Sequence, residues 1–154
     1  MRVFAGIVLL AVCVVIGFFY ARKYTVRKKE FEFLKTFNSR VKSEVAFSKS
    51  SLISLVKKID DERAVANYVR EFFLRKNDRL EGLGVLKKEE KEFLSDYVKK
   101  LGQGDVSAQK DFLSEAGVVI DGYLSECVRQ EKQYGSLSLK LGFLFGLIIL
   151  IILL

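Results

Sequence analysis

Two clusters of carboxylates are the residues in this chain whose types and spacing could perform acid–base chemistry. They are Asp60-Asp61-Glu62 and Glu89-Glu90-Glu92. Neighbouring carboxylates can act as a general acid and base, or together bind a metal ion. Each cluster also has cations beside it, Arg63 next to the first and three lysines around the second. Solvated helix faces with local ion pairs therefore explain both clusters better than a catalytic site does.

The other reactive residue types are scarce. The chain has no histidine and two cysteines, Cys13 and Cys127, so it lacks the Ser-His, Cys-His and His-rich zinc arrangements. The Gly82/Gly84 and Gly102/Gly104 pairs lack the spacing of a phosphate-binding loop and its following Lys-Ser/Thr. We therefore expect no catalytic residue, no cofactor and no bound metal, and we expect that the protein is not an enzyme.

The end of the chain is strongly apolar. Leu141–Leu154 contains fourteen apolar residues, which as a helix would extend about 21 Å and fall short of a hydrocarbon core of about 30 Å. Including residues from Leu137 gives eighteen, or about 27 Å, because Lys140 can extend its ammonium group to the lipid headgroups. A buried core helix is the alternative, but 154 residues rarely enclose a helix that is apolar on all sides. Residues 137–154 are thus predicted to form a transmembrane helix.

The start of the chain predicts a second span. Val3–Ala21 has no charged residue and would extend about 28 Å as a helix. A signal peptide is the alternative, but this run is long for one and lacks a small-x-small cleavage pattern before the basic residues. We expect residues 1–21 to be a retained membrane anchor.

Cations at the inner ends of both runs predict the orientation. The net charge of +7 is concentrated there, since twenty Lys and Arg against nineteen Asp and Glu remain once Arg2 and residues 22–29 are set aside. This distribution suits anionic lipid headgroups and does not suggest nucleic-acid binding. Residues 22–136 are then cytoplasmic, with both termini across the membrane. The cations expected at the headgroups are Arg22, Lys23, Arg27, Lys28 and Lys29.

Small residues predict where the spans pack. Gly142 and Gly146 are four residues apart and share one helix face, as do Gly17 and Ala21 in the first run. Without large side chains on such a face, two transmembrane helices can approach closely. We expect the last span to pack against the first span or against a neighbouring subunit, which leaves a homo-oligomer open.

The central region predicts helices throughout. It contains no proline, and its apolar residues recur every three or four positions, as in a helix. The first span should continue as an amphipathic helix toward Phe47, and a helix from about Val106 should continue into the last span, with a bend near Gly135. Shorter helices are expected around 52–59, 65–73 and 87–101. The fold class is therefore all-α, an antiparallel helical bundle between two transmembrane helices.

The clearest turn is Leu101-Gly102-Gln103-Gly104-Asp105. A glycine there can adopt the left-handed conformation that ends one helix, and Asp105 can cap the next. Besides that structural role, a loop held between rigid helices is a common place for binding.

Two motifs resemble a known family. Leu101-Gly102 followed by Asp105 and Gln109, and Leu141-Gly142-Phe143-Leu144 followed by Gly146-Leu147, are similar to the stage III sporulation protein AB family of endospore-forming bacteria. The resemblance extends over essentially the whole chain. This family is in turn similar to the cytoplasmic helical domains of type II secretion F proteins, which meet a secretion ATPase in the inner membrane.

The resemblance implies a membrane subunit of the channel or feeding apparatus between mother cell and forespore, located in the mother-cell membrane around the forespore. The implied partners are a companion sporulation ATPase and other stage III channel subunits. Leu101, Gly102, Asp105 and Gln109 are then candidate partner-binding residues. A membrane-tethered adaptor or regulatory binding module unconnected with sporulation is the alternative function. A neighbouring gene for a secretion-type ATPase would favour the first.

Overall fold

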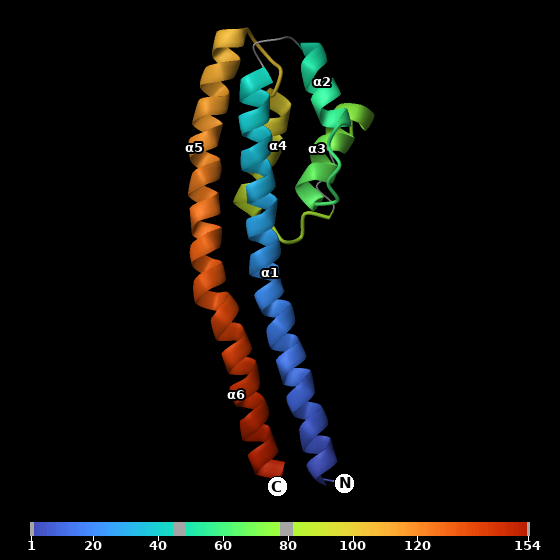
Figure 1. The fold of residues 1–154 in the computed structure, drawn as a ribbon, viewed down its shortest axis with the longest axis vertical. Helices are drawn as coiled ribbons and strands as arrows, with labels where there is room; N and C mark the ends of the chain where they lie inside the picture. Colours follow the sequence, from blue (N-terminus) through green and yellow to red (C-terminus); the bar gives the residue numbers. More distant parts are fainter. Residues whose placement is uncertain (1, 45–48, 78–81, 154) are drawn as a thin grey trace. The chain divides into compact units, whose positions relative to one another are not determined.

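A computed structural model describes residues 2–44, 49–77 and 82–153, and within these ranges every regular element is a helix (Figure 1). The all-α prediction is therefore confirmed. Met1, Leu154 and residues 45–48, which include Phe47 at the predicted end of the first helix, lie outside the described residues. The elements are α1 (Arg2–Glu44), α2 (Lys49–Lys57), α3 (Ala64–Arg75), α4 (Lys88–Lys100), α5 (Val106–Gln130), a π-helical turn η1 (Glu131–Gly135) and α6 (Ser136–Leu153).

The last helix has no break between Val106 and Leu153. Gln130 and Ser136, on either side of the π-helical turn, both have φ −67° and ψ −39°, which is ordinary right-handed helix. The helix predicted from Val106 into the tail is therefore present. At Gly135, where the sequence predicted a bend, the structure has the end of the wider π turn.

The chain divides into two compact units. The two-helix unit comprises residues 1–28 and 125–154, and the multi-helix unit comprises residues 29–124. In the two-helix unit the first half of α1 packs antiparallel to α6, and Figure 1 shows the two termini at the same end of this unit. Among the described residues, α1 from Val8 is the one helix that is long and apolar enough to cross a membrane.

The core of the multi-helix unit is built from the apolar faces that the sequence repeat predicts. Leu34 and Val41 of α1 are fully or nearly fully buried, as are Val69 of α3, Val98 of α4 and Leu113 of α5. Aromatic rings connect these faces, since Tyr97 stacks on Phe112 and Phe93 packs edge-on against Tyr123. Each helix in this unit therefore contributes one apolar face to a shared interior.

Candidate functional site

The two apolar helices touch at glycines. A Cβ atom on Gly142 would lie 2.8 Å from the carbonyl oxygen of Cys13, and one on Gly17 would lie 2.8 Å from the carbonyl oxygen of Ser138. Any side chain at either position would collide with backbone, so the close contact requires glycine at both. A Cβ on Gly146 would lie 3.0 Å from the side chain of Leu10 and 3.2 Å from its backbone Cα. Ala21 is half-buried one turn beyond Gly17.

Polar and aromatic contacts continue this pairing beyond the apolar helices. Tyr24 stacks on Tyr134 with ring centroids 5.8 Å apart, Arg27 donates a hydrogen bond to Oε1 of Gln130 over 2.6 Å, and Lys28 forms an ion pair of 2.9 Å with Glu131. Arg27 is only 4% exposed. Two of the five cations expected at the headgroups, Arg27 and Lys28, thus have partners within the protein. Arg22, Lys23 and Lys29 are exposed.

The turn at Leu101–Asp105 is stabilised by all four residues that the sequence indicated: Leu101, Gly102, Asp105 and Gln109. Gly102 has φ +79°, which favours glycine, and its N–H donates to Oε1 of Gln109 over 3.0 Å. The Gln109 amide nitrogen donates to the carbonyls of Lys100 and Gln103. Asp105 caps α5 by accepting from the N–H of Ala108 over 2.8 Å, and Leu101 is buried. Partner binding by this turn stays a prediction.

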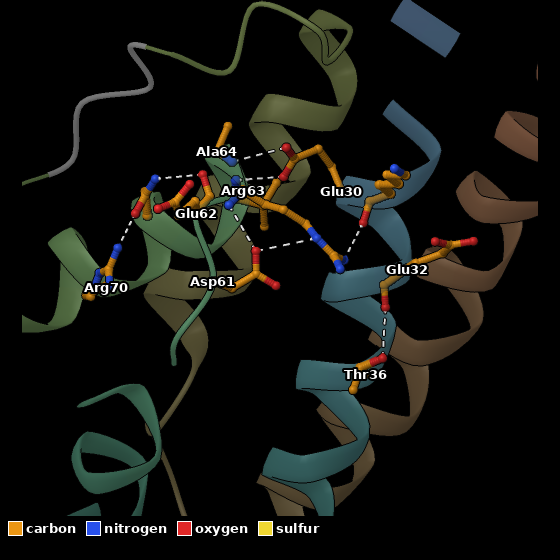
Figure 2. Close-up of polar contacts among 11 residues, drawn as sticks. Glu30, Glu32, Thr36, Asp61, Glu62, Arg63, Ala64 and Arg70 are labelled. Atoms are coloured by element: carbon orange, nitrogen blue, oxygen red, sulfur yellow. Dashed lines mark hydrogen bonds and ion pairs between the residues drawn. The ribbon is translucent and has the colours of Figure 1, made fainter. Parts of the chain in front are cut away.

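A buried carboxylate from α1 caps α3. Glu30 is 4% exposed, and its two oxygens accept hydrogen bonds from the N–H groups of Ala64 and Val65 over 3.0 and 2.8 Å, as Figure 2 shows. These are first-turn donors that have no partner inside α3, and the helix dipole favours a negative charge there. Glu30 therefore stabilises the start of a helix that is 34 residues away in the chain.

Arg63 holds the same junction from its other side. Its guanidinium donates to the carbonyl of Lys29 over 2.9 Å, and its backbone N–H donates to Oδ1 of Asp61 over 2.9 Å (Figure 2). The guanidinium also lies over the ring of Phe33 at 5.9 Å. Asp61 is thus engaged with Arg63. The backbone carbonyl of Glu62 accepts from the side chain of Asn67. In the first carboxylate cluster, the Asp61 side chain therefore helps to hold a helix junction.

The second carboxylate cluster has comparable contacts. Glu90 is 1% exposed and accepts from the N–H of Lys87 over 2.8 Å, which caps α4, and Glu92 lies 3.9 Å from the ammonium of Lys88. Among the described residues, no group of three or more His, Cys, Asp or Glu is arranged to hold a metal ion. Cys13 and Cys127 are both free thiols.

A buried polar network connects three helices of the multi-helix unit. Asn38 of α1 donates to the carbonyl of Leu113 in α5 over 3.0 Å and accepts from the hydroxyl of Tyr97 in α4 over 3.0 Å. Burial raises the pKa of the Tyr97 hydroxyl far above its usual range, because the charged form would be desolvated. A Cβ on Gly117 would lie 3.2 Å from Nδ2 of Asn38, so the absent side chain leaves room for the amide.

Sequence reasoning missed two buried polar residues of α1, Glu30 and Asn38, although a signal was present. Asn38 belongs to the same helix face as Leu34 and Val41, and Glu30 directly precedes the buried Phe31. A polar residue at an apolar position of a helical repeat indicates a buried hydrogen bond, because burying it without a partner is costly. The partners themselves come from distant parts of the chain, so the repeat could not identify them.

A groove lined by both apolar and charged side chains lies beside the junction of α1 and α3. It has a volume of about 380 Å³ and lies between α1 and the segment that runs from α2 to α3. Phe33 and Phe37 line it, together with the cations Arg40 and Lys58 and the carboxylates of Glu44 and Asp60. The charges of its lining residues are balanced, since Arg63 and Asp61 line it as well.

Comparison with known proteins agrees with the resemblance seen in the two motifs. No curated protein and no solved structure matches the chain. The profile of the family described as stage III sporulation protein AB matches residues 2–85 and, in a second segment, residues 70–154. Together the two segments cover nearly all of the sequence, including the paired glycines, the Leu101–Asp105 turn and the buried polar residues of α1. The chain therefore belongs to the stage III sporulation protein AB family and is a sporulation-related protein.

Proposed function

We propose that this chain is a non-enzymatic membrane subunit of the channel or feeding apparatus between mother cell and forespore. Its two apolar helices are inserted in the mother-cell membrane around the forespore. The helices of residues 22–136 lie in the cytoplasm as a bundle that serves as a platform for a secretion-type ATPase. Other stage III channel subunits are its further partners.

The observation that carries this proposal is the pairing of two apolar helices that have little else to pack on. Gly17 and Gly142 bring the backbones together, yet large apolar side chains on both helices remain exposed, including Phe19 at 63% and Phe145 at 58%. In water, exposed apolar surface of this extent is unfavourable. In a bilayer it is the surface that lipid tails cover, and the glycine contact is the usual means by which spans associate.

The orientation is supported by the exposed cations that follow each apolar stretch on the central side. Arg22 and Lys23 lie at the end of the first, and Lys140 lies near the start of the second. Cytoplasmic flanks accumulate such cations. Both termini are then across the membrane from the central helices.

The two spans can be tested by labelling single cysteines in cells. A variant with Cys13→Ser and Cys127→Ser would carry either Gln103→Cys, in the exposed turn, or Ile152→Cys, in the tail. A membrane-impermeant maleimide should label position 152 in intact protoplasts of vegetative cells made to express the chain, where the far side of the membrane faces the medium, and position 103 only after permeabilisation. Labelling of both positions in intact protoplasts, or of neither, would contradict the topology. Release of the chain by alkaline carbonate would contradict membrane insertion itself.

The platform role is tested by recovering partners with the intact chain from sporulating cells. We expect the companion ATPase and further channel subunits to be recovered with it. Recovery of an unrelated soluble protein in their place would favour a tethered adaptor.

Two variants of the turn separate its folding role from partner binding. Asp105→Ala removes the cap of α5, whereas Gln103→Glu alters an exposed side chain and keeps the Gly102–Gln109 contacts. If the turn meets the ATPase, the Gln103→Glu variant should recover less ATPase than the wild-type chain while keeping the same thermal stability. Reduced stability of Asp105→Ala with full recovery for both variants would leave the turn a structural feature alone.

A further inference from the structure

The contacts of the two-helix unit bring Arg129 and Lys132 close, along the helix axis, to Arg22 and Lys23 of α1. The Tyr24–Tyr134 stack, the Arg27–Gln130 hydrogen bond and the Lys28–Glu131 ion pair fix how the two helices are aligned. Lys132 lies two residues from Tyr134, and Lys23 and Arg22 lie one and two residues from Tyr24. At 1.5 Å per residue these three cations are within about 3 Å of the tyrosine pair along the axis, and Arg129 is about 7.5 Å away.

Within the described part of the chain, these four cations differ from Arg27 and Lys28 in having no side-chain partner. Arg22, Lys23, Arg129 and Lys132 are all exposed, and none forms a hydrogen bond or ion pair with its side chain to another residue in the described part of the chain. By contrast, Arg27 is hydrogen-bonded to Gln130 and Lys28 forms an ion pair with Glu131. Among the six cations nearest the tyrosine pair in this unit, two thus hold the helices together and four are available for binding.

The placement of the four fits a surface that surrounds the helices. Two cations come from each of the paired helices: Arg22 and Lys23 directly follow the first apolar stretch, and Arg129 and Lys132 lie before the second, which starts at Leu137. The stacked tyrosines are of the amphipathic type that concentrates at membrane interfaces. A small soluble anion needs cations that converge on one point, whereas a leaflet of headgroups contacts exposed cations on any side of the helix pair.

We propose that Arg22, Lys23, Arg129 and Lys132 form a basic collar that binds the phosphates of anionic phospholipids in the cytoplasmic leaflet. Arg129 and Lys132 are three residues apart and so lie on adjacent positions of the helix surface, where both can reach one headgroup. Arg contributes a planar fork that matches a phosphate, and Lys a point charge. This inference rests on the membrane insertion proposed above.

The test uses the full chain extracted from vesicles that contain phosphatidylcholine and phosphatidylglycerol in equal amounts. Native mass spectrometry then counts the lipids of each kind that remain bound. The wild-type chain should retain phosphatidylglycerol in excess, and the double variant Arg129→Gln/Lys132→Gln should lose that excess. Each cation removed should weaken binding about five-fold at low salt, and added salt should reduce the wild-type excess.

A matched control separates the collar from net charge. Arg40→Gln/Lys58→Gln removes two exposed cations from the multi-helix unit and so makes the same change in net charge. It should leave the phosphatidylglycerol excess unchanged. Equal losses in both double variants, or no loss in Arg129→Gln/Lys132→Gln at unchanged thermal stability, would overturn the collar.

The same preparation distinguishes failure of the collar from failure of membrane insertion. If alkaline carbonate releases the wild-type chain from the vesicles, both proposals are wrong. If the chain stays in the membrane and the lipid counts do not depend on Arg129 and Lys132, the collar alone is wrong.

Discussion

The hydroxyl of Tyr97 donates a hydrogen bond of 3.0 Å to the side-chain oxygen of Asn38, inside the core of the multi-helix unit. The amide nitrogen of the same asparagine donates to the backbone carbonyl of Leu113. One side chain of α1 thereby engages both α4 and α5. Because a shift of any of the three helices would leave a buried polar group without its partner, this network favours a single alignment of the three helices.

Asn38→Leu should lower the free energy of unfolding by about 2–3 kcal/mol, because it leaves the Tyr97 hydroxyl buried without an acceptor. The double variant with Tyr97→Phe should cost less than the sum of the two single variants, since both halves of the pair are then removed. Chemical denaturation of the full chain in detergent measures all three. Thr36→Val, which removes an exposed hydrogen bond within α1, is the control and should change stability by less than about 0.5 kcal/mol. Additive losses would mean that the hydroxyl and the amide do not depend on each other.

Alanine at Gly117 and at Gly122 should have opposite effects, although both glycines lie within α5. At Gly122 a Cβ has no other atom within 4 Å, so alanine should stabilise the helix by up to about 1 kcal/mol. At Gly117 the Cβ would displace the Asn38 amide, which is held by Leu113, and stability should fall by about 1–2 kcal/mol. Thermal unfolding of the two variants side by side gives the comparison. Equal stabilisation by both would show that Asn38 moves aside without loss.

Glu30→Gln should loosen the start of α3. The amide keeps one acceptor oxygen but loses the charge that favours the helix terminus, and we expect a loss of about 1–2 kcal/mol. Amide hydrogen exchange should increase first at Ala64 and Val65. Glu32→Gln changes an exposed carboxylate on the same helix and should leave exchange at these two amides unchanged. Equal protection of α3 in both variants would mean that its first turn does not depend on Glu30.

Stability should decrease above about pH 10 through Tyr97. An unfolded tyrosine loses its proton near pH 10, and burial raises the pKa of Tyr97 in the folded chain well above that value. The folded state therefore retains a proton that the unfolded state releases. This contribution is complete below pH 10 and declines by about 1.4 kcal/mol per pH unit above it. The stability advantage of wild type over Tyr97→Phe should accordingly shrink between pH 9 and pH 11, and a constant difference would contradict the assignment.

Gly142→Val should separate the two apolar helices more effectively than Gly146→Val. The first places carbon atoms 2.8 Å from the backbone oxygen of Cys13, whereas the second meets the Leu10 side chain at 3.0 Å and the Leu10 backbone Cα at 3.2 Å, which is less close. Leu144→Val, at an exposed position of α6, should have little effect. Thermal unfolding in detergent should rank the losses in that order. A loss at Leu144 as large as that at Gly142 would indicate that α6 presents a different face to its partner.

The sequence predicted those features that depend on local patterns. The apolar repeat located the described helices to within a few residues, Gly102 and Asp105 marked a real turn, and the close contact of Gly142 with the first helix follows from the lack of a side chain. It could not predict contacts between distant residues. Arg27 was expected to face lipid because it belongs to a run of cations, yet the helix alignment places it beside Gln130. That choice depends on which residue lies opposite, and periodicity carries no such information.

The π-helical turn at Glu131–Gly135 sets the rotational phase of α6. Such a turn accommodates one residue more than an α-helix would, and one residue corresponds to about 100° of rotation. On one side of the turn Gln130 faces Arg27, and on the other Gly142 faces Cys13 and Gly17. If residues 131–135 formed an ordinary α-helix with no residue removed, the glycines would be turned about 100° away from α1. Because of the extra residue in this turn, the helix of residues 106–153 faces α1 with polar side chains before the turn and with glycines after it.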